Sequence, residues 1–123
     1  MKKTDLRTLS TSQLVECFAD IAMQQYTAMM GNDVKTFNKL YGQMDEVTNE
    51  LKSRPGDQRR ALIALYDHPN IQVRMKAAVK TLAINYESAR RVLEEVAKRQ
   101  PYPQAGAAGM TLDALDRGIF KPT

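Results

Sequence analysis

Hydrophobic residues recur at helical spacing along most of the chain, and no stretch alternates as a β-strand would. The clearest region spans residues 54–85 and predicts two helices joined by a corner at residues 68–70. Asp57 is placed to cap the first helix, which should end near Asp67. It should stop there because Pro69 lacks an N–H and disfavours helical backbone in the residue before it.

The second helix of this pair has a broad apolar face, and Asn70 is placed to cap it. The face consists of Ile71, Val73, Met75, Ala77, Ala78 and Leu82. The adjacent small residues Ala77 and Ala78 would let another helix approach closely. A helix that packs on both sides in this way is typical of stacked helical hairpins.

The N-terminal part has the pattern of an antiparallel helical hairpin. Ser10 with Gln13, or Ser12 alone, is placed to cap a helix over about residues 12–30. A second helix follows a Gly-Asn-Asp turn and covers about residues 33–53. The expected inward-facing positions are Leu14, Val15, Phe18, Ile21, Ala22, Ala28 and Met29, then Val34, Phe37, Leu40, Tyr41, Met44, Val47 and Leu51.

A third hairpin is predicted from helices over about residues 86–100 and 104–117. Its corner is the rigid run Pro101-Tyr102-Pro103. Pro103 follows Pro69 by 34 residues, and this spacing matches the period of helical solenoids.

The pattern as a whole predicts an all-α fold, an α-α superhelix of about six helices in three antiparallel hairpins. We expect a single helical-repeat domain over residues 1–123. Gly118 is placed to end the last helix, and residues 119–120 should fold back over the core. The three hairpins are expected over residues 12–53, 54–85 and 86–123.

Composition supports one soluble domain, since 43% hydrophobic and 26% charged residues are ordinary for such a protein. The single cysteine, Cys17, cannot form an internal disulfide, which fits a reducing cytoplasm. Residues 1–10 lack the apolar run of a signal peptide and should form a frayed lead-in. No segment approaches the roughly twenty apolar residues of a membrane span. We therefore expect a cytoplasmic protein with no membrane association.

The net charge of +4 is unevenly divided. Residues 1–51 carry 5 Lys/Arg against 7 Asp/Glu, whereas residues 52–123 carry 13 against 7. A basic C-terminal half favours an acidic partner or the backbone of a nucleic acid.

The stretch PNIQVRMKAA (residues 69–78) resembles the second-helix signature of HEAT-type repeats. Arg74 would be the arginine of that signature, which pairs with an acidic or carbonyl partner in a neighbouring turn. Together with RPGDQRRAL, PQAGAAGM and the ending GIFKP, this stretch resembles a small bacterial family described as a domain of unknown function. The resemblance covers most of the chain after Leu14. It implies an armadillo/HEAT-like α-superhelix, a fold class in which some members are immunity proteins found beside secreted toxins.

The residues do not favour catalysis, and the resembling family carries no established catalytic residues to transfer. Cys17 has apolar helical neighbours and reads as a small buried thiol. His68, the only histidine, stands before a proline and suits a turn or cap. A metal site would need several His or Cys residues or a Glu-x-x-His pattern, and the chain has neither. We expect no enzyme activity, no metal and no cofactor.

Stacked hairpins present one continuous face built from their second helices, and such faces mainly bind proteins. The residues expected on this face, and hence at a partner-binding site, are Gln72, Arg74, Lys76, Lys80 and Gln104. We therefore expect a protein-binding domain of the immunity or antitoxin type, which masks its partner. Met23, Tyr26 and Met30 fall outside the inner face of the first helix and would form a partner patch or the seam of a homodimer.

Binding of a nucleic-acid backbone through Lys76 and Lys80 is the alternative, and its affinity would depend on salt. Two charge patterns count against it: Arg90-Glu94-Lys98 and Arg91-Glu95-Arg99 alternate in sign at a spacing of four. Cations in such patterns are partly neutralised within their own helix.

Overall fold

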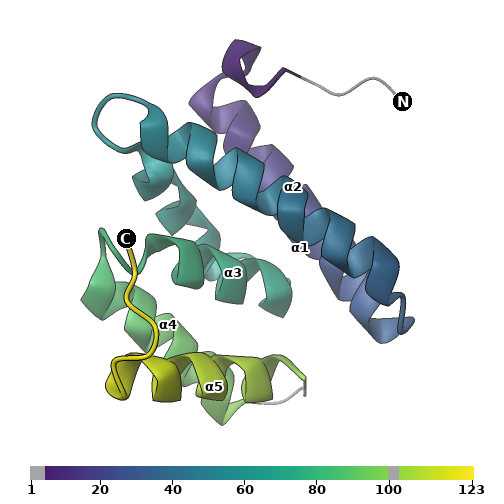
Figure 1. Cartoon of the computed structure of the whole chain (residues 1–123), viewed down its shortest axis with the longest axis vertical. Coiled ribbons are helices and arrows are strands. Elements are labelled where there is room, and N and C mark those ends of the chain that lie inside the picture. Colours follow the sequence, from purple (N-terminus) through teal and green to yellow (C-terminus); the bar gives the residue numbers. More distant parts are fainter. Residues whose placement is uncertain (1–4, 100–102) are drawn as a thin grey trace. The chain divides into compact units, whose positions relative to one another are not determined.

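The computed structural model describes residues 5–99 and 103–123, and Figure 1 shows that helices make up its regular structure. The elements in chain order, with η for a 3-10 helix, are η1 (Leu6–Thr8), α1 (Thr11–Met30), α2 (Val34–Ser53), η2 (Gln58–Asp67), α3 (Ile71–Thr81), α4 (Tyr86–Lys98) and α5 (Gln104–Asp116). No strand occurs within these two described ranges, and the predicted all-α class is confirmed. The chain divides into two compact units, Met1–Ala61 and Leu62–Thr123; that they act as one domain stays a prediction.

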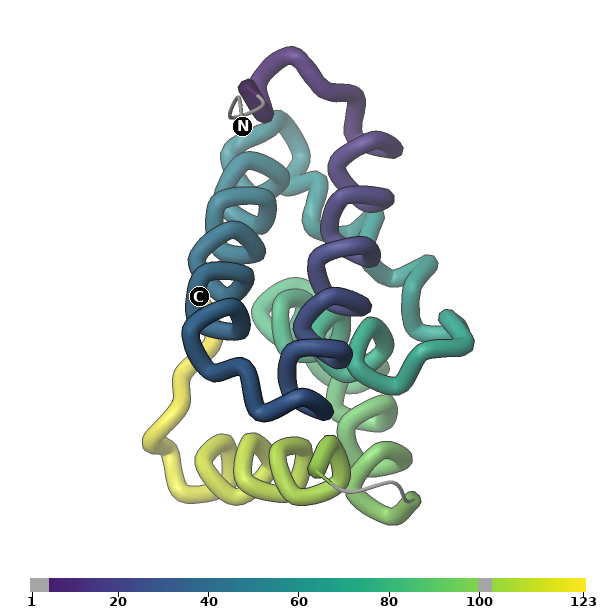
Figure 2. Tube along the Cα trace, turned by 90° about the vertical axis from the view of Figure 1, so that its right-hand side faces the viewer, coloured from purple at the N-terminus to yellow at the C-terminus, as the bar shows by residue number. Residues whose placement is uncertain are grey.

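In the first unit, α1 and α2 pack against each other as the predicted hairpin (Figure 2). Ser10 begins α1 with a capping box: its hydroxyl accepts from Gln13 N at 3.1 Å, and Gln13 Oε1 accepts from Ser10 N at 2.8 Å. Asp33 caps α2 by accepting from Thr36 N at 3.1 Å. The turn between the helices is tight because Asn32 adopts a left-handed backbone with φ of 55°.

The core of this hairpin follows the predicted apolar positions. Its fully or almost fully buried side chains are Leu14, Phe18, Ala22, Leu40, Met44, Val47 and Leu51. The prediction is wrong at the start of α2, where Val34 is 66% exposed, and at Tyr41, which is 47% exposed. It is also wrong for Cys17, which is half-buried rather than enclosed.

Residues 5–10 are ordered by Arg54 at the end of α2, so the expectation of a frayed lead-in is wrong for them. The Arg54 guanidinium donates to the carbonyl oxygens of Leu9 at 2.7 Å and Leu6 at 3.1 Å. It also donates to the carboxylate of Glu50 at 2.9 Å. Charge-assisted bonds of this kind are stronger than neutral ones, so they hold η1 against the hairpin.

The helix expected after Asp57 is a 3-10 helix, η2, rather than an α-helix. Burial follows its period of three residues per turn, since Arg59, Leu62 and Leu65 are buried while Ile63 between them is exposed. The chain enters η2 through two residues with positive φ, Gly56 at 80° and Asp57 at 51°. The predicted end at Asp67 is confirmed.

In the second unit, α3 packs against both α4 and α5, and these two pack against each other. Asn70 caps α3 as predicted, its Oδ1 accepting from Gln72 N at 2.8 Å and Val73 N at 3.2 Å. α5 begins directly after Pro103, while the rest of the predicted corner, Pro101 and Tyr102, lies outside the described residues. The core of the unit is Leu62, Ile71, Val73, Met75, Ala77, Ala78, Leu82, Ala89, Leu93, Val96 and Ala108.

α5 ends at Asp116, and Gly118 closes it as predicted, in a Schellman motif that needs a positive φ, here 70°. The N–H groups of Gly118 and Ile119 donate to the carbonyls of Leu115 and Ala114 at 3.1 and 2.9 Å. The expectation that Ile119 covers the core is wrong, because its side chain is 68% exposed.

Candidate functional site

The five residues predicted to bind a partner do not form one exposed surface. Gln72 and Gln104 have no exposed side-chain area at all, so their expected placement on an open face is wrong. Gln104 Nε2 donates to Gln72 Oε1 at 3.3 Å, which joins α5 to α3 inside the second unit. A buried amide pair of this kind fixes the register of two helices and is not available to a partner.

Arg74 stabilises the corner between η2 and α3. Its guanidinium donates to the carbonyl oxygens of His68 at 2.7 Å and Pro69 at 3.1 Å. His68 Nδ1 in turn accepts from Asn70 N at 3.0 Å. The carbonyl partner implied for this arginine and the turn role of His68 are both confirmed.

Lys76 and Lys80 follow on α3, and both are half-buried. Each interacts with other groups of the protein. Their part in partner binding stays a prediction, and any partner would have to compete with those interactions.

Arginines of the basic half are largely bonded within the protein. Arg59 donates to Asp57 at 2.6 Å and lowers the pKa of that carboxyl, chiefly through this side-chain hydrogen bond. Arg90 reaches Asp116 at 2.9 Å and Glu94 at 3.5 Å, and the hydrogen bonds that its guanidinium donates to Asp116 and then to Tyr86 raise its pKa. The other such ion pairs are Arg54–Glu50, Arg99–Glu95 and Arg117–Asp113. Positive charge on this half is therefore less available than the composition indicates.

The contacts of residues that could hold a metal or carry a hydroxyl nucleophile can be given for the described part of the chain. Among the residues that the structure describes, no group of three His, Cys, Asp or Glu could hold a metal ion. Tyr66 shares a short hydrogen bond with Thr81, whose hydroxyl donates to the Ala77 carbonyl at 2.8 Å. The Tyr66 hydroxyl is then the donor in the shared bond. No base stands beside either hydroxyl in these contacts.

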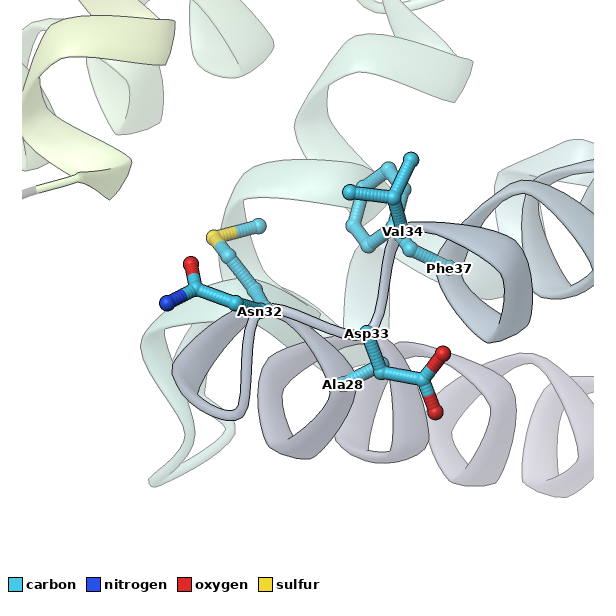
Figure 3. Close-up of a pocket in the computed structure, with 6 residues that line it drawn as sticks. Ala28, Asn32, Asp33, Val34 and Phe37 are labelled. Atoms are coloured by element: carbon cyan, nitrogen blue, oxygen red, sulfur yellow. The ribbon is translucent and has the colours of Figure 1, made fainter.

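A concave site lies elsewhere, at the turn between α1 and α2 (Figure 3). This hairpin-tip pocket has a volume of about 260 Å3 and is lined by Ala28, Met29, Asn32, Asp33, Val34 and Phe37. The side chains of Val34 and Phe37 lie on the same side of the turn, whereas the Asp33 carboxylate points away from them. The pocket is thus apolar inside and carries an acidic group on its rim.

The rim carboxylate is ionised at neutral pH. The hydrogen bond from the Thr36 side chain, followed by that from its backbone N–H, lowers the pKa of Asp33. The adjoining end of α1 has no basic residue in its last turn. Its last carbonyls accept from the backbone N–H groups of Gly31, Asn32 and Asp33, and the N-terminus of α2 follows directly, so Asp33 supplies the formal negative charge of this turn.

Sequence reasoning points to exposed apolar residues of α1 that do not line this pocket. Met23 and Met30, predicted as a partner patch or dimer seam with Tyr26, are 38% and 48% exposed, and Tyr26 is half-buried. Val34 and Phe37 were assigned to the core because they continue the apolar spacing of α2. One signal could have revealed the exposed position of these two residues. The turn at residues 31–33 leaves little of α1 to cover the first residues of α2.

No helix of the described residues is both long enough and apolar enough to cross a membrane.

Comparisons with known proteins agree with this architecture. A family described as "Domain of unknown function (DUF2019)" matches residues 12–116. The crystal structure of the protein RPA1889 from Rhodopseudomonas palustris CGA009 is similar, with 48% sequence identity and a TM-score of 0.94. The match covers 98% of this chain and 100% of that chain. No relative is found among the curated proteins.

Proposed function

The chain belongs to the bacterial DUF2019 family, in agreement with the resemblance in its sequence, and we propose that it is a non-catalytic, HEAT-like protein-binding domain. One observation carries the proposal. The apolar hairpin-tip pocket is open at the surface. In contrast, His68 and Arg74, whose side chains are of types used in catalysis, are hydrogen-bonded within the turn between η2 and α3. An exposed concave apolar site with a polar rim is what protein interfaces use at their centre.

The partner in this proposal is a toxin whose active site the domain masks, because some proteins of this fold class are immunity proteins. The natural test is the gene beside that of the domain. Its product should halt growth when expressed alone in a heterologous host, and co-expression of the domain should restore growth and give a stable complex. A neighbouring product that is harmless, or a domain that neither rescues nor binds, would remove the immunity role.

The protein-binding role itself is tested by affinity capture with the full chain, with and without nuclease treatment, over a range of salt concentrations. We expect a protein partner whose retention is unaffected by nuclease. Retention of nucleic acid alone, falling steeply with salt, would instead support backbone binding. The internal ion pairs of Arg59, Arg90 and Arg99 argue against that alternative.

Two sets of variants locate the contact. Charge reversal by Lys76→Glu and Lys80→Glu tests the surface of α3, and Val34→Gln tests the hairpin tip. Circular dichroism and thermal unfolding must accompany the lysine variants, because both lysines interact within the fold. Loss of capture in folded Val34→Gln alone assigns the contact to the tip, and loss in the folded lysine variants alone assigns it to α3.

A further inference from the structure

The size of the hairpin-tip pocket limits what can fill it. Its volume is about 260 Å3. A buried apolar cavity of about 150 Å3 already binds benzene, so this pocket has room for one aromatic or branched aliphatic side chain. A folded helix or a sheet edge would not enter it.

The lining favours an apolar group. Ala28, Met29, Val34 and Phe37 supply hydrocarbon and thioether surface, and methionine adapts its shape to different ligands. Val34 is 66% exposed, so covering it would remove apolar area from water that the fold leaves uncovered.

The charges around the pocket favour a basic neighbour to that apolar group. The Asp33 carboxylate lies on the rim, and its lowered pKa keeps it negatively charged at neutral pH. α1 contains no lysine or arginine, and Glu16 and Asp20 are its charged residues. The next basic residue along the chain is Lys35, which helix periodicity places about 160° around α2 from Phe37, away from the pocket.

We propose that the hairpin-tip pocket receives a single bulky apolar side chain flanked by lysine or arginine, presented by the partner protein. This inference rests on the protein-binding function proposed above and specifies the part of the partner that enters the site. The apolar side chain provides the affinity, and the flanking cation provides the preference, since it meets the Asp33 carboxylate.

Three capped tripeptides test the proposal on the full chain: acetyl-Lys-Phe-Lys-amide, acetyl-Glu-Phe-Glu-amide and acetyl-Lys-Ala-Lys-amide. Methyl NMR signals of Ala28, Met29 and Val34 report directly on the pocket. The lysine-flanked phenylalanine peptide should give saturable shifts at millimolar concentration. The glutamate-flanked peptide should bind roughly two- to fivefold more weakly at low salt, and the alanine peptide should give no shifts.

Variants identify the groups responsible. Val34→Gln should weaken the phenylalanine peptide about fivefold, because less apolar surface is covered. Met110→Gln is the matched control, since Met110 is 75% exposed on α5 in the other unit, and it should bind like the native chain. Asp33→Asn keeps a good helix cap and should reduce the preference for the lysine-flanked peptide.

Each contrary result has a defined meaning. No saturable shift at about 10 mM peptide, where even a millimolar site would be mostly filled, would overturn the pocket. If the alanine peptide gives shifts equal to those of the phenylalanine peptide, the apolar part of the proposed ligand is overturned. If both phenylalanine peptides bind equally well, the basic part is overturned. If the Val34→Gln variant captures a protein partner as well as the native chain does, this site is overturned and the protein-binding function stays intact. If the native chain binds the peptide but captures no protein, the proposed protein-binding function is overturned instead.

Discussion

Gln104 on α5 donates its side-chain amide to the side-chain carbonyl of Gln72 on α3 across 3.3 Å, with both side chains fully buried. The two residues are 32 positions apart in the sequence. Buried polar groups cost free energy unless they are hydrogen-bonded, and this bond offsets part of that cost for both glutamines. The pair therefore specifies how the last helix docks on α3.

Replacing one member of this pair should destabilise the fold. Gln104→Ala or Gln72→Ala should lower the free energy of unfolding by about 1–3 kcal/mol, because each leaves a buried amide without this hydrogen bond. Chemical denaturation of both variants and of the double variant gives the coupling between them, which should be at least about 0.5 kcal/mol. Gln24→Ala is the control: Gln24 bonds Asp20 on the exposed face of α1, and its loss should cost less than about 0.5 kcal/mol. Additive effects of the two buried substitutions would contradict the pairing.

Arg74 should be needed for stability rather than for recognition. Arg74→Ala should lower the free energy of unfolding by about 1.5–3 kcal/mol, because two carbonyls of the η2–α3 corner lose a charged donor. Arg74→Lys should recover only part of this loss, since one nitrogen of Arg74, Nη1, donates to both carbonyls and the lysine side chain is one bond shorter than the path to Nη1. Urea unfolding measures both effects. The exposed Arg91→Ala provides the reference, and equal stability of the Arg74→Ala and Arg91→Ala variants would remove the structural role.

Local signals explain why most helix boundaries could be predicted. A helix end needs a cap within a few residues, and Ser10, Asp33, Asn70 and Gly118 are caps that can be read from their own neighbourhoods. The 3-10 geometry of η2 has no such signal. Two buried leucines three residues apart fit an α-helix and a 3-10 helix equally well, and Asp57 suits both a helix cap and the positive φ that it adopts.

The candidate site was less predictable because burial of polar residues depends on distant partners. Sequence alone predicts Gln72 and Gln104 at the surface, as isolated glutamines usually are, and it does not reveal their buried contact across 32 positions. The opposite error concerns Val34. Its apolar side chain continues the helical spacing of α2, which predicts burial, but it lies beside the turn of the hairpin and is exposed. Helical spacing says which side of a helix a residue occupies, and it does not say how far the neighbouring helix extends.

The ion pair of Asp57 with Arg59 should make stability depend on pH. Arg59 lowers the pKa of the Asp57 carboxyl in the folded protein. The stabilisation from this ion pair is therefore complete above the pKa of the unfolded carboxyl, about 4, and is lost as the pH falls through the lower pKa of the folded protein. Asp57→Asn tolerates the same positive φ and should cost about 1 kcal/mol at neutral pH. The difference in unfolding free energy between the two proteins should be constant above about pH 5 and shrink below about pH 4.

Comparing these two proteins isolates the pair, because Asp5 and Asp33 also have lowered pKa values and contribute equally to both. Urea unfolding between pH 3 and pH 7 provides the measurement. A difference that stays constant, or one that grows on acidification, would show that the Asp57 carboxylate does not stabilise the fold.

Gly109 is a position where the fold can be made more stable. It lies inside α5, and a Cβ built on it would meet no atom within 4 Å. Gly109→Ala should therefore raise the free energy of unfolding by about 0.5–1 kcal/mol, because alanine loses less backbone entropy in a helix. Thermal unfolding at several protein concentrations measures the effect.

Two other glycines provide the controls. Gly42 lies in α2 with equally open space, so Gly42→Ala should stabilise by a similar amount. Gly118→Ala should destabilise, because its φ of 70° disfavours any residue with a Cβ. A loss of stability in Gly109→Ala that deepens with protein concentration, while Gly42→Ala behaves as expected, would contradict the open space at α5. It would mean that a second copy of the chain approaches α5 at Gly109, since no atom of the described residues, apart from the adjoining residues and backbone of α5, lies within 4 Å of the added methyl group.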